Sequence, residues 1–132
     1  MKIASILSFI LALTLSACLT DNTAQLLQGD WRVISIEATG QAVENAPADY
    51  ILQFGEDGNL SLRLDVNNCG GRFNTFNGGN IDIEPMGCTE ACCDTPFAQQ
   101  LAGLLSEMEH FDIQGRTLTL HGAAGLVVAR AE

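Results

Sequence analysis

The feature that most constrains the fold is a series of short segments in which apolar and polar residues alternate. In YILQFGEDGNLSLRLDV, residues 50–66, two such runs flank Asp57-Gly58. Alternation with a period of two predicts β-strands with one buried face, and Asp-Gly between two such runs predicts a tight hairpin turn. The pattern recurs along the chain, so we expect a domain built mainly from antiparallel strands.

The other β-like runs are short and are separated by residues that favour turns, chiefly Gly, Asn and Asp. These runs are residues 31–36, 72–76, 80–83, 111–113, 117–121 and 126–129. Their number and their short connections indicate one domain without repeats.

One amphipathic helix is predicted among the strands, over about residues 95–109. Asp94 or Thr95 is suited to its N-cap and Pro96 to its first turn. The apolar side chains that follow share one helical face: Phe97, Leu101, Leu104, Leu105 and Met108. We therefore predict an α+β fold, in which a mainly antiparallel curved β-sheet packs against this single helix.

The N-terminal segment MKIASILSFILALTLSAC has the organisation of a secretory signal peptide. Lys2 precedes an apolar run that is shorter than the roughly 20 residues needed to cross a bilayer. The sequence LSAC, residues 15–18, resembles the lipobox of bacterial lipoproteins, in which the cysteine becomes the first mature residue and is acylated. A lipid anchor on Cys18 is therefore expected.

This interpretation divides the chain into a lipoprotein signal peptide over residues 1–17, a tether over residues 18–26 and one domain over residues 27–132. It places the protein in the bacterial cell envelope, attached to the membrane through lipidated Cys18. Leu19 after the cysteine favours the outer membrane, facing the periplasm.

The chain is acidic, with a formal net charge of −10. Once residues 1–17 are removed, its only strongly basic side chains are five arginines: Arg32, Arg63, Arg72, Arg116 and Arg130. So few cations argue against nucleic acid and anionic headgroups as binding partners. The expected partners are the membrane, through the lipid, and an envelope protein.

Catalytic residues are scarce. Nucleophilic catalysis requires a base beside the nucleophile, and His110 and His121 are the chain's only histidines. Each is expected at the end of a secondary-structure element, which favours a structural role. The Gly-rich segments NNCGGRF and NGGN lack the lysine and the following helix of a phosphate-binding loop. We therefore predict a protein without enzymatic activity or a cofactor.

Four cysteines remain after acylation of Cys18: Cys69, Cys88, Cys92 and Cys93. An oxidising compartment favours two disulfides. The alternative is a thiol-redox or metal-binding module built from these cysteines. It is less favoured because the spacing lacks the Cys-x₂-Cys pairs typical of zinc and thioredoxin-like sites.

The residues alone leave two disulfide pairings open. A bond between Cys92 and Cys93 is disfavoured because adjacent Cα atoms lie only about 3.8 Å apart across a trans peptide bond. Cys69 is then expected to pair with Cys92 or Cys93, and Cys88 with the other.

The order of these motifs resembles the META domain family, also called HslJ-like, of bacterial envelope lipoproteins. The matching segments are LQGDWRVISIEATGQAV, ILQFGEDGNLSLRL, NNCGGRFNTFNGG, GCTEACCD and FDIQGRTLTLHGAAGLVV, within about residues 26–129. The most specific are the opening Leu27-x-Gly29-x-Trp31 and the two cysteine segments. The family usually has Gly-Cys-Asn where this chain has Asn68-Cys69-Gly70.

The resemblance implies an antiparallel β-rich domain with a packed helix and no established enzymatic activity. The family usually has one cysteine four residues after the threonine, which matches Cys93. The resemblance therefore implies a Cys69–Cys93 disulfide, with Cys88–Cys92 as an additional pair. It also implies an envelope lipoprotein whose disulfide-stapled domain binds a partner or supports envelope stress tolerance.

Overall fold

The computed structural model describes residues 22–132. The predicted signal peptide, the predicted lipidation site Cys18 and the first part of the predicted tether lie outside the described residues. Within residues 22–132, no helix is both long enough and apolar enough to cross a membrane.

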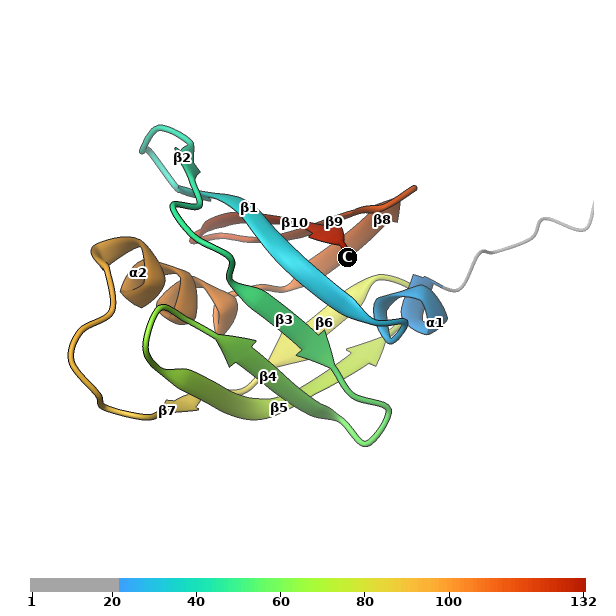
Figure 1. Ribbon diagram of the computed structural model, residues 1–132. Helices are drawn as coiled ribbons and strands as arrows, with labels where there is room; N and C mark the ends of the chain where they lie inside the picture. The colour runs from blue at the N-terminus through green and yellow to red at the C-terminus, as the bar shows by residue number, and fades with distance from the viewer. Residues whose placement is uncertain (1–21) are drawn as a thin grey trace, which may run out of the picture.

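The described chain contains ten strands and two short helices (Figure 1). In chain order they are α1 (Asn22–Leu26), β1 (Asp30–Ala38), β2 (Glu44–Asn45), β3 (Ile51–Phe54), β4 (Asn59–Arg63), β5 (Asn68–Phe76), β6 (Asn80–Ile83), β7 (Gly87–Cys88), α2 (Pro96–Leu105), β8 (His110–Gln114), β9 (Thr117–Gly122) and β10 (Gly125–Ala131). The prediction of a mainly antiparallel sheet is confirmed, and so is the hairpin at Asp57-Gly58, which joins β3 to β4.

The sheet closes into a barrel, which corrects the prediction of an open curved sheet. Its ring runs β1-β3-β4-β5-β6-β8-β9-β10, and β10 pairs with β1 from Trp31↔Ala131 to Ala38↔Gly125. Closure removes the unpaired edges that an open sheet would present. The weakest junction in the ring is between β6 and β8, which share the single register pair Asn80↔His110.

The interior of the barrel is filled by side chains rather than by a cavity for a ligand. The inward residues of the strands form one apolar cluster, and Trp31, Leu52, Leu60, Leu118 and Leu120 are among its fully buried members. An eight-stranded barrel is just narrow enough to be filled in this way. Binding chemistry must therefore be sought on the outer surface.

The two helices lie at opposite ends of the barrel (Figure 1). In α2, the apolar face predicted from the sequence is buried, and Phe97 stacks on Tyr50 with ring centroids 5.3 Å apart. Of the two residues suited to the N-cap in the sequence, Thr95 takes the role, and its side chain accepts a hydrogen bond from Ala98 N–H. The helix ends at Leu105 rather than near residue 109, because the backbone tightens there and turns into β8.

The predicted tether overlaps α1, which is part of the packed domain. Leu26 is fully buried, and its carbonyl accepts a hydrogen bond from the indole Nε1–H of Trp31 at 2.9 Å. Gln25 Nε2 also donates to Gly115 O in the turn between β8 and β9. Folded structure therefore begins by Asn22. The sequence analysis did not predict the two-residue strands β2 and β7.

Candidate functional site

The cysteine segment lies where β7 pairs with β5, on the stretch of that strand that β6 does not reach. Cys69 and Cys88 face each other directly in the antiparallel register and form a disulfide, with Cα atoms 4.0 Å apart. This corrects the Cys69–Cys93 pairing implied by the family resemblance. The physical reason is the register, since Cys88 occupies the position opposite Cys69.

The other two cysteines, Cys92 and Cys93, form the second disulfide of the described chain. This pairing of neighbours differs from both pairings that the residues alone left open. All four predicted cysteines are thus placed in disulfides.

The loop after β7 is held to the turn between β4 and β5 by one buried asparagine. The Nδ2 of Asn67 donates to the carbonyl of Ala91 at 2.8 Å and to the carboxylate of Asp94. Its Oδ1 accepts from Thr89 Oγ1 and from Ala91 N–H, each at 2.8 Å. Asn67 is the only buried polar residue among residues 22–132, and every polar atom of its side chain is bonded.

A second group of hydrogen bonds connects the same turn to the start of α2. Asp65 Oδ2 accepts from Thr95 N–H at 3.0 Å and from Thr95 Oγ1 at 2.9 Å. Its other oxygen, Oδ1, accepts from the Tyr50 hydroxyl at 2.8 Å. The turn between β4 and β5 is therefore linked to the start of α2 by two carboxylates and an asparagine.

These contacts shift the ionisation of the groups involved. The N–H of Thr95 holds the pKa of Asp65 below its usual value, and the N–H of Val66 does the same for the pKa of Asp94. Burial raises the pKa of Tyr50. The charged carboxylates are thus the forms that the fold favours. We call residues 65–67 and 89–95 together the clasp, in which Asp65, Asn67, Thr89, Asp94 and Thr95 bond to other groups of the same domain.

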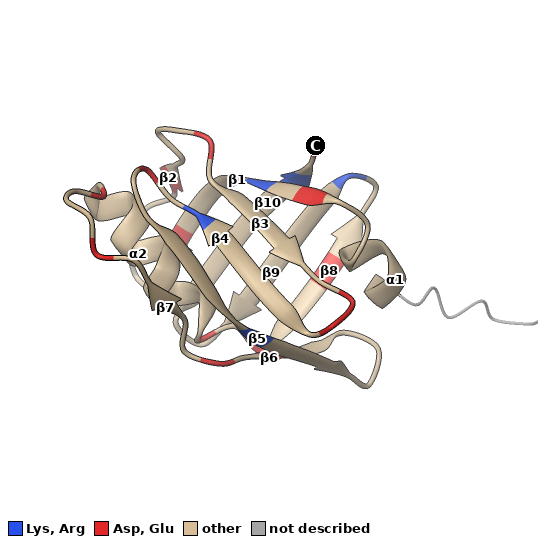
Figure 2. Cartoon of the chain, turned by 60° about the horizontal axis from the view of Figure 1, so that its bottom comes forward, with Lys and Arg blue, Asp and Glu red and all other residues tan. Residues whose placement is uncertain are grey.

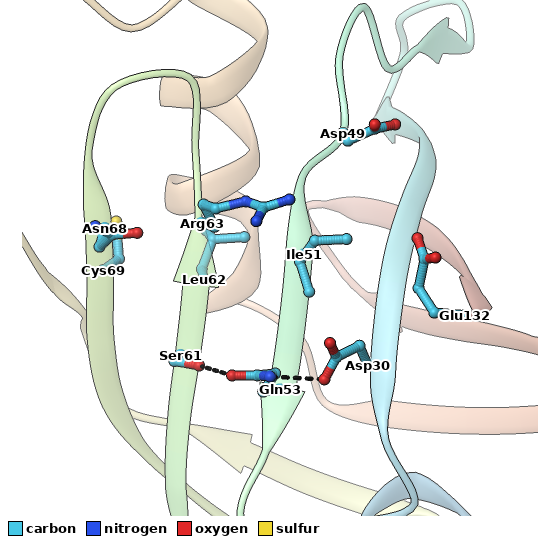
Figure 3. Close-up of a pocket in the computed structure, with 10 residues that line it drawn as sticks. All are labelled: Asp30, Asp49, Ile51, Gln53, Ser61, Leu62, Arg63, Asn68, Cys69 and Glu132. Carbon is cyan, nitrogen blue, oxygen red and sulfur yellow. Dashed lines mark hydrogen bonds between the residues drawn. The ribbon is translucent and has the colours of Figure 1, made fainter.

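A hollow lies on the outer face of the barrel, beside the clasp (Figure 3). It encloses about 570 Å³. Its lining comes from β1, the loop before β3, β3, β4, β5 and the C-terminus: Asp30, Asp49, Ile51, Gln53, Ser61, Leu62, Arg63, Asn68, Cys69 and Glu132. We call this surface the groove.

The acidic side chains of the groove are already paired. Asp30 accepts a hydrogen bond from Gln53 at 2.6 Å, and Gln53 in turn accepts from Ser61 at 3.0 Å. Arg32, just outside the groove, lies 3.8 Å from Asp49 and 3.2 Å from Glu132. These pairs lie in solvent and contribute little to stability, and Arg32 offsets only part of the negative charge of the three carboxylates.

Arg63 is different. Its guanidinium reaches from β4 toward β3 in Figure 3 and makes no hydrogen bond or ion pair with any residue of the described chain. The side-chain amide of Asn68, on the neighbouring strand, is likewise unbonded within residues 22–132. A planar cation with five donors, beside an amide, is suited to binding a carboxylate from another molecule.

The groove continues past Arg63 into a second hollow of about 340 Å³. Arg63 and Asp49 line both hollows, and the second also contains Val66, an apolar side chain that is 49% exposed. The combined surface is therefore an elongated polar strip with a free cation at its middle and an apolar position at one end.

The other candidate residues from the sequence are Trp31 and the two histidines. Trp31 is 1% exposed and belongs to the core. His110 and His121 lie together on the outer face of β8 and β9. The sequence placed each at the end of a different element and did not predict that they are neighbours. Figure 2 shows acidic residues spread over several loops and strands, with arginines near the C-terminus on β1, β10 and the β8–β9 turn.

Sequence reasoning did not identify the groove. In the sequence, Arg63 is one of several polar residues that alternate along a strand, and its lack of a partner is a property of the folded surface. The alternation of residues along β4 could have indicated the groove. Ser61 and Arg63 share the exposed face of the strand, opposite to the buried Leu60 and Leu62.

Comparisons with known proteins agree with this architecture. The sequence model of the META domain family matches residues 24–132. An NMR structure of a protein from Burkholderia xenovorans has a TM-score of 0.67 and 16% identity, covering 84% of this chain and 86% of that one. A crystal structure of a DUF4847 family protein from Bacteroides vulgatus has a TM-score of 0.62 and 11% identity, covering 81% and 94%. A comparison with curated proteins gives no match.

Proposed function

The chain belongs to the META domain family, and from this premise we propose that it is a non-enzymatic, lipid-anchored binding protein of the bacterial cell envelope. In this proposal Cys18 carries the lipid, the barrel is a rigid module held by its disulfides and the clasp, and the groove receives a segment of an envelope protein. No cofactor takes part.

The observation that carries the proposal is the free guanidinium of Arg63 in an elongated surface groove. An arginine that neither stabilises the fold nor neutralises a neighbouring acid is available to a partner. Arginine is enriched at the positions that dominate binding energy in protein interfaces, where carboxylates of the partner bind it bidentately. The filled barrel interior directs binding to the outer surface as well.

The chemistry of the groove defines the partner. Gln53, Ser61 and Asn68 provide hydroxyl and amide groups along neighbouring strands, and Arg63 offers charge to a carboxylate. Exposed Val66 at one end would contact an apolar side chain. We therefore propose an extended protein segment that carries an acidic residue followed or preceded by an apolar one.

Site-specific photo-crosslinking in living cells tests this proposal. A photoreactive amino acid at Ser61, in the groove, should give a discrete crosslinked species that contains an envelope protein. The matched control carries the same amino acid at Glu90, which is exposed in the clasp loop. The same species from both positions, or none from Ser61, would contradict the groove as the binding site.

The lipid anchor has its own test. Metabolic labelling with a palmitate analogue should label the wild-type protein, and Cys18→Ser should abolish the label and release the protein from the membrane fraction. Separation of inner from outer membranes then checks the proposed outer-membrane location. An unlabelled wild-type protein would overturn the anchor without affecting the groove.

The stress-tolerance component is tested by deletion and complementation. A strain lacking the gene should be more sensitive to detergent and heat, and the wild-type gene should restore tolerance. The Arg63→Gln gene should restore less, although its product is present at the same level. A deletion strain that tolerates these stresses normally would remove this part of the proposal.

A further inference from the structure

The two histidines of this chain are direct neighbours on adjacent strands. His110 opens β8, His121 lies near the end of β9, and the antiparallel register places them opposite each other. Both side chains are on the outer face, since the residues next to them in sequence, Phe111 and Leu120, point into the core. We call them the histidine pair.

The separation of the two rings matches that of two imidazoles bound to one metal ion. Their centroids lie 5.3 Å apart. With metal–nitrogen bonds of about 2.0–2.1 Å, each ring centre lies about 3.2 Å from the metal, and two rings at a tetrahedral angle have centres about 5 Å apart. The separation of the two rings is therefore compatible with both imidazoles binding one metal ion.

The surroundings favour a cation. A hollow of about 510 Å³ opens beside His110, and its lining includes three carboxylates, from Asp82, Glu107 and Glu109. Concentrated negative charge raises the local concentration of cations around a site. Within residues 22–132, no group of three or more His, Cys, Asp or Glu side chains is arranged to hold a metal. Two imidazoles would thus be the only protein ligands.

We propose that the histidine pair is a surface binding site for a divalent transition metal ion, with water or an external ligand at the remaining positions. Imidazole suits Cu²⁺, Ni²⁺ and Zn²⁺, and affinity for a given set of nitrogen ligands is highest for Cu²⁺. The expected order of affinity is Cu²⁺ above Ni²⁺ and Zn²⁺, with Mn²⁺ weakest. The site is independent of the groove and of the proposed envelope function.

Calorimetric titration of the full chain with each metal chloride tests the proposal. The protein is purified in detergent with a histidine-free tag, in a buffer that does not bind metals. One Cu²⁺ should bind per chain. The variants His110→Ala and His121→Ala should each bind Cu²⁺ at least about tenfold more weakly, because even the loss of an outer-shell partner costs about 10–100-fold.

A carboxylate variant and a spectrum separate the histidine pair from other sites. Glu107→Gln combined with Glu109→Gln should weaken binding less than either histidine variant. Electron paramagnetic resonance of the Cu²⁺ complex should show two imidazole nitrogens in the wild type and one in each histidine variant. All variants should melt at the wild-type temperature without metal. Equal Cu²⁺ affinity in His121→Ala and the wild type, or no binding by the wild type, would overturn the proposal.

Discussion

The clasp and the groove lie side by side on the β4–β5 hairpin, yet they treat polar side chains in opposite ways. In the clasp, Asn67 is buried and bonded through every polar atom of its side chain. In the groove, Arg63 ends the strand that leads into the same turn and is bonded to nothing in the described chain. The comparison indicates which polar residues stabilise the fold and which are available to a partner.

The difference follows from the cost of burial. A polar group removed from water without a partner costs about 1–3 kcal/mol, so a buried asparagine is retained only where its contacts are complete. An exposed arginine carries no such penalty, because water solvates it. Evolution can therefore leave Arg63 unpaired at almost no cost in stability. Variants of the two regions separate these roles.

The largest loss is expected on removal of the Cys69–Cys88 disulfide. Replacing both cysteines by alanine should lower the free energy of unfolding by about 3 kcal/mol, because the bond closes a loop of 19 residues' separation in the unfolded chain. Urea denaturation measures the change. Peptide mapping of the non-reduced protein is the companion experiment: a peptide joining Cys69 to Cys93 would contradict the register of β5 and β7.

A somewhat smaller loss is expected for Asn67→Ala. It should cost about 2 kcal/mol, because it leaves the N–H and C=O of Ala91 and the Thr89 hydroxyl without their partner. The matched control is Asn68→Ala, which removes the same amide from the next, exposed residue and should change stability by less than about 0.5 kcal/mol. Equal effects at the two positions would remove the distinction between clasp and groove.

The clasp should also make stability depend on pH. The pKa of Asp94 and that of Asp65 are lower in the folded protein than their ordinary value of 3.8, so protonation favours the unfolded chain. Their contribution is complete above the ordinary pKa and is lost as the pH falls through the folded value. Thermal melting of Asp94→Asn between pH 2 and pH 7 should vary less with pH than that of the wild type.

The turn between β3 and β4 contributes to the same pH dependence, because the N–H of Asn59 lowers the pKa of Asp57. The wild-type pH dependence therefore combines the clasp with this turn. Asp57→Asn provides the comparison, and each variant should remove only part of the dependence. If Asp94→Asn followed the wild-type curve, the clasp carboxylate would play no part in acid sensitivity.

The smallest effect on stability is expected for Arg63→Gln. The change should be within about 0.5 kcal/mol by urea denaturation, since the guanidinium has no hydrogen bond or ion pair to lose among residues 22–132. Arg72→Gln is the matched control, because Arg72 bonds to Asn59 Oδ1 and to the carbonyl of Asp57 at the far end of β4. The control should be the more destabilised of the two, and the reverse order would show that Arg63 supports the fold.

The sequence predicted the features that depend on neighbouring residues. The Asp57-Gly58 hairpin, the Thr95 N-cap and the buried face of α2 follow from local conformational preferences and from periodicity. The closure of β1 onto β10 could not be predicted in this way, because these strands are far apart in sequence and their pairing depends on the curvature of the whole sheet.

The site residues were harder to predict for the same reason. The Cys69–Cys88 pairing and the histidine pair each depend on which residues of two strands lie opposite one another, and a shift of the register would change both. The availability of Arg63 could not be predicted from the sequence, because it depends on the folded surface. No acidic side chain of residues 22–132 forms an ion pair with its guanidinium.

Whether Arg63 binds a partner is tested most directly by the yield of the Ser61 crosslink in cells that carry Arg63→Gln. The division between clasp and groove predicts that this yield falls severalfold, whereas Arg72→Gln, which removes the same charge from the same face, leaves it unchanged. An equal yield in Arg63→Gln and the wild type would contradict the assignment of Arg63 to a partner.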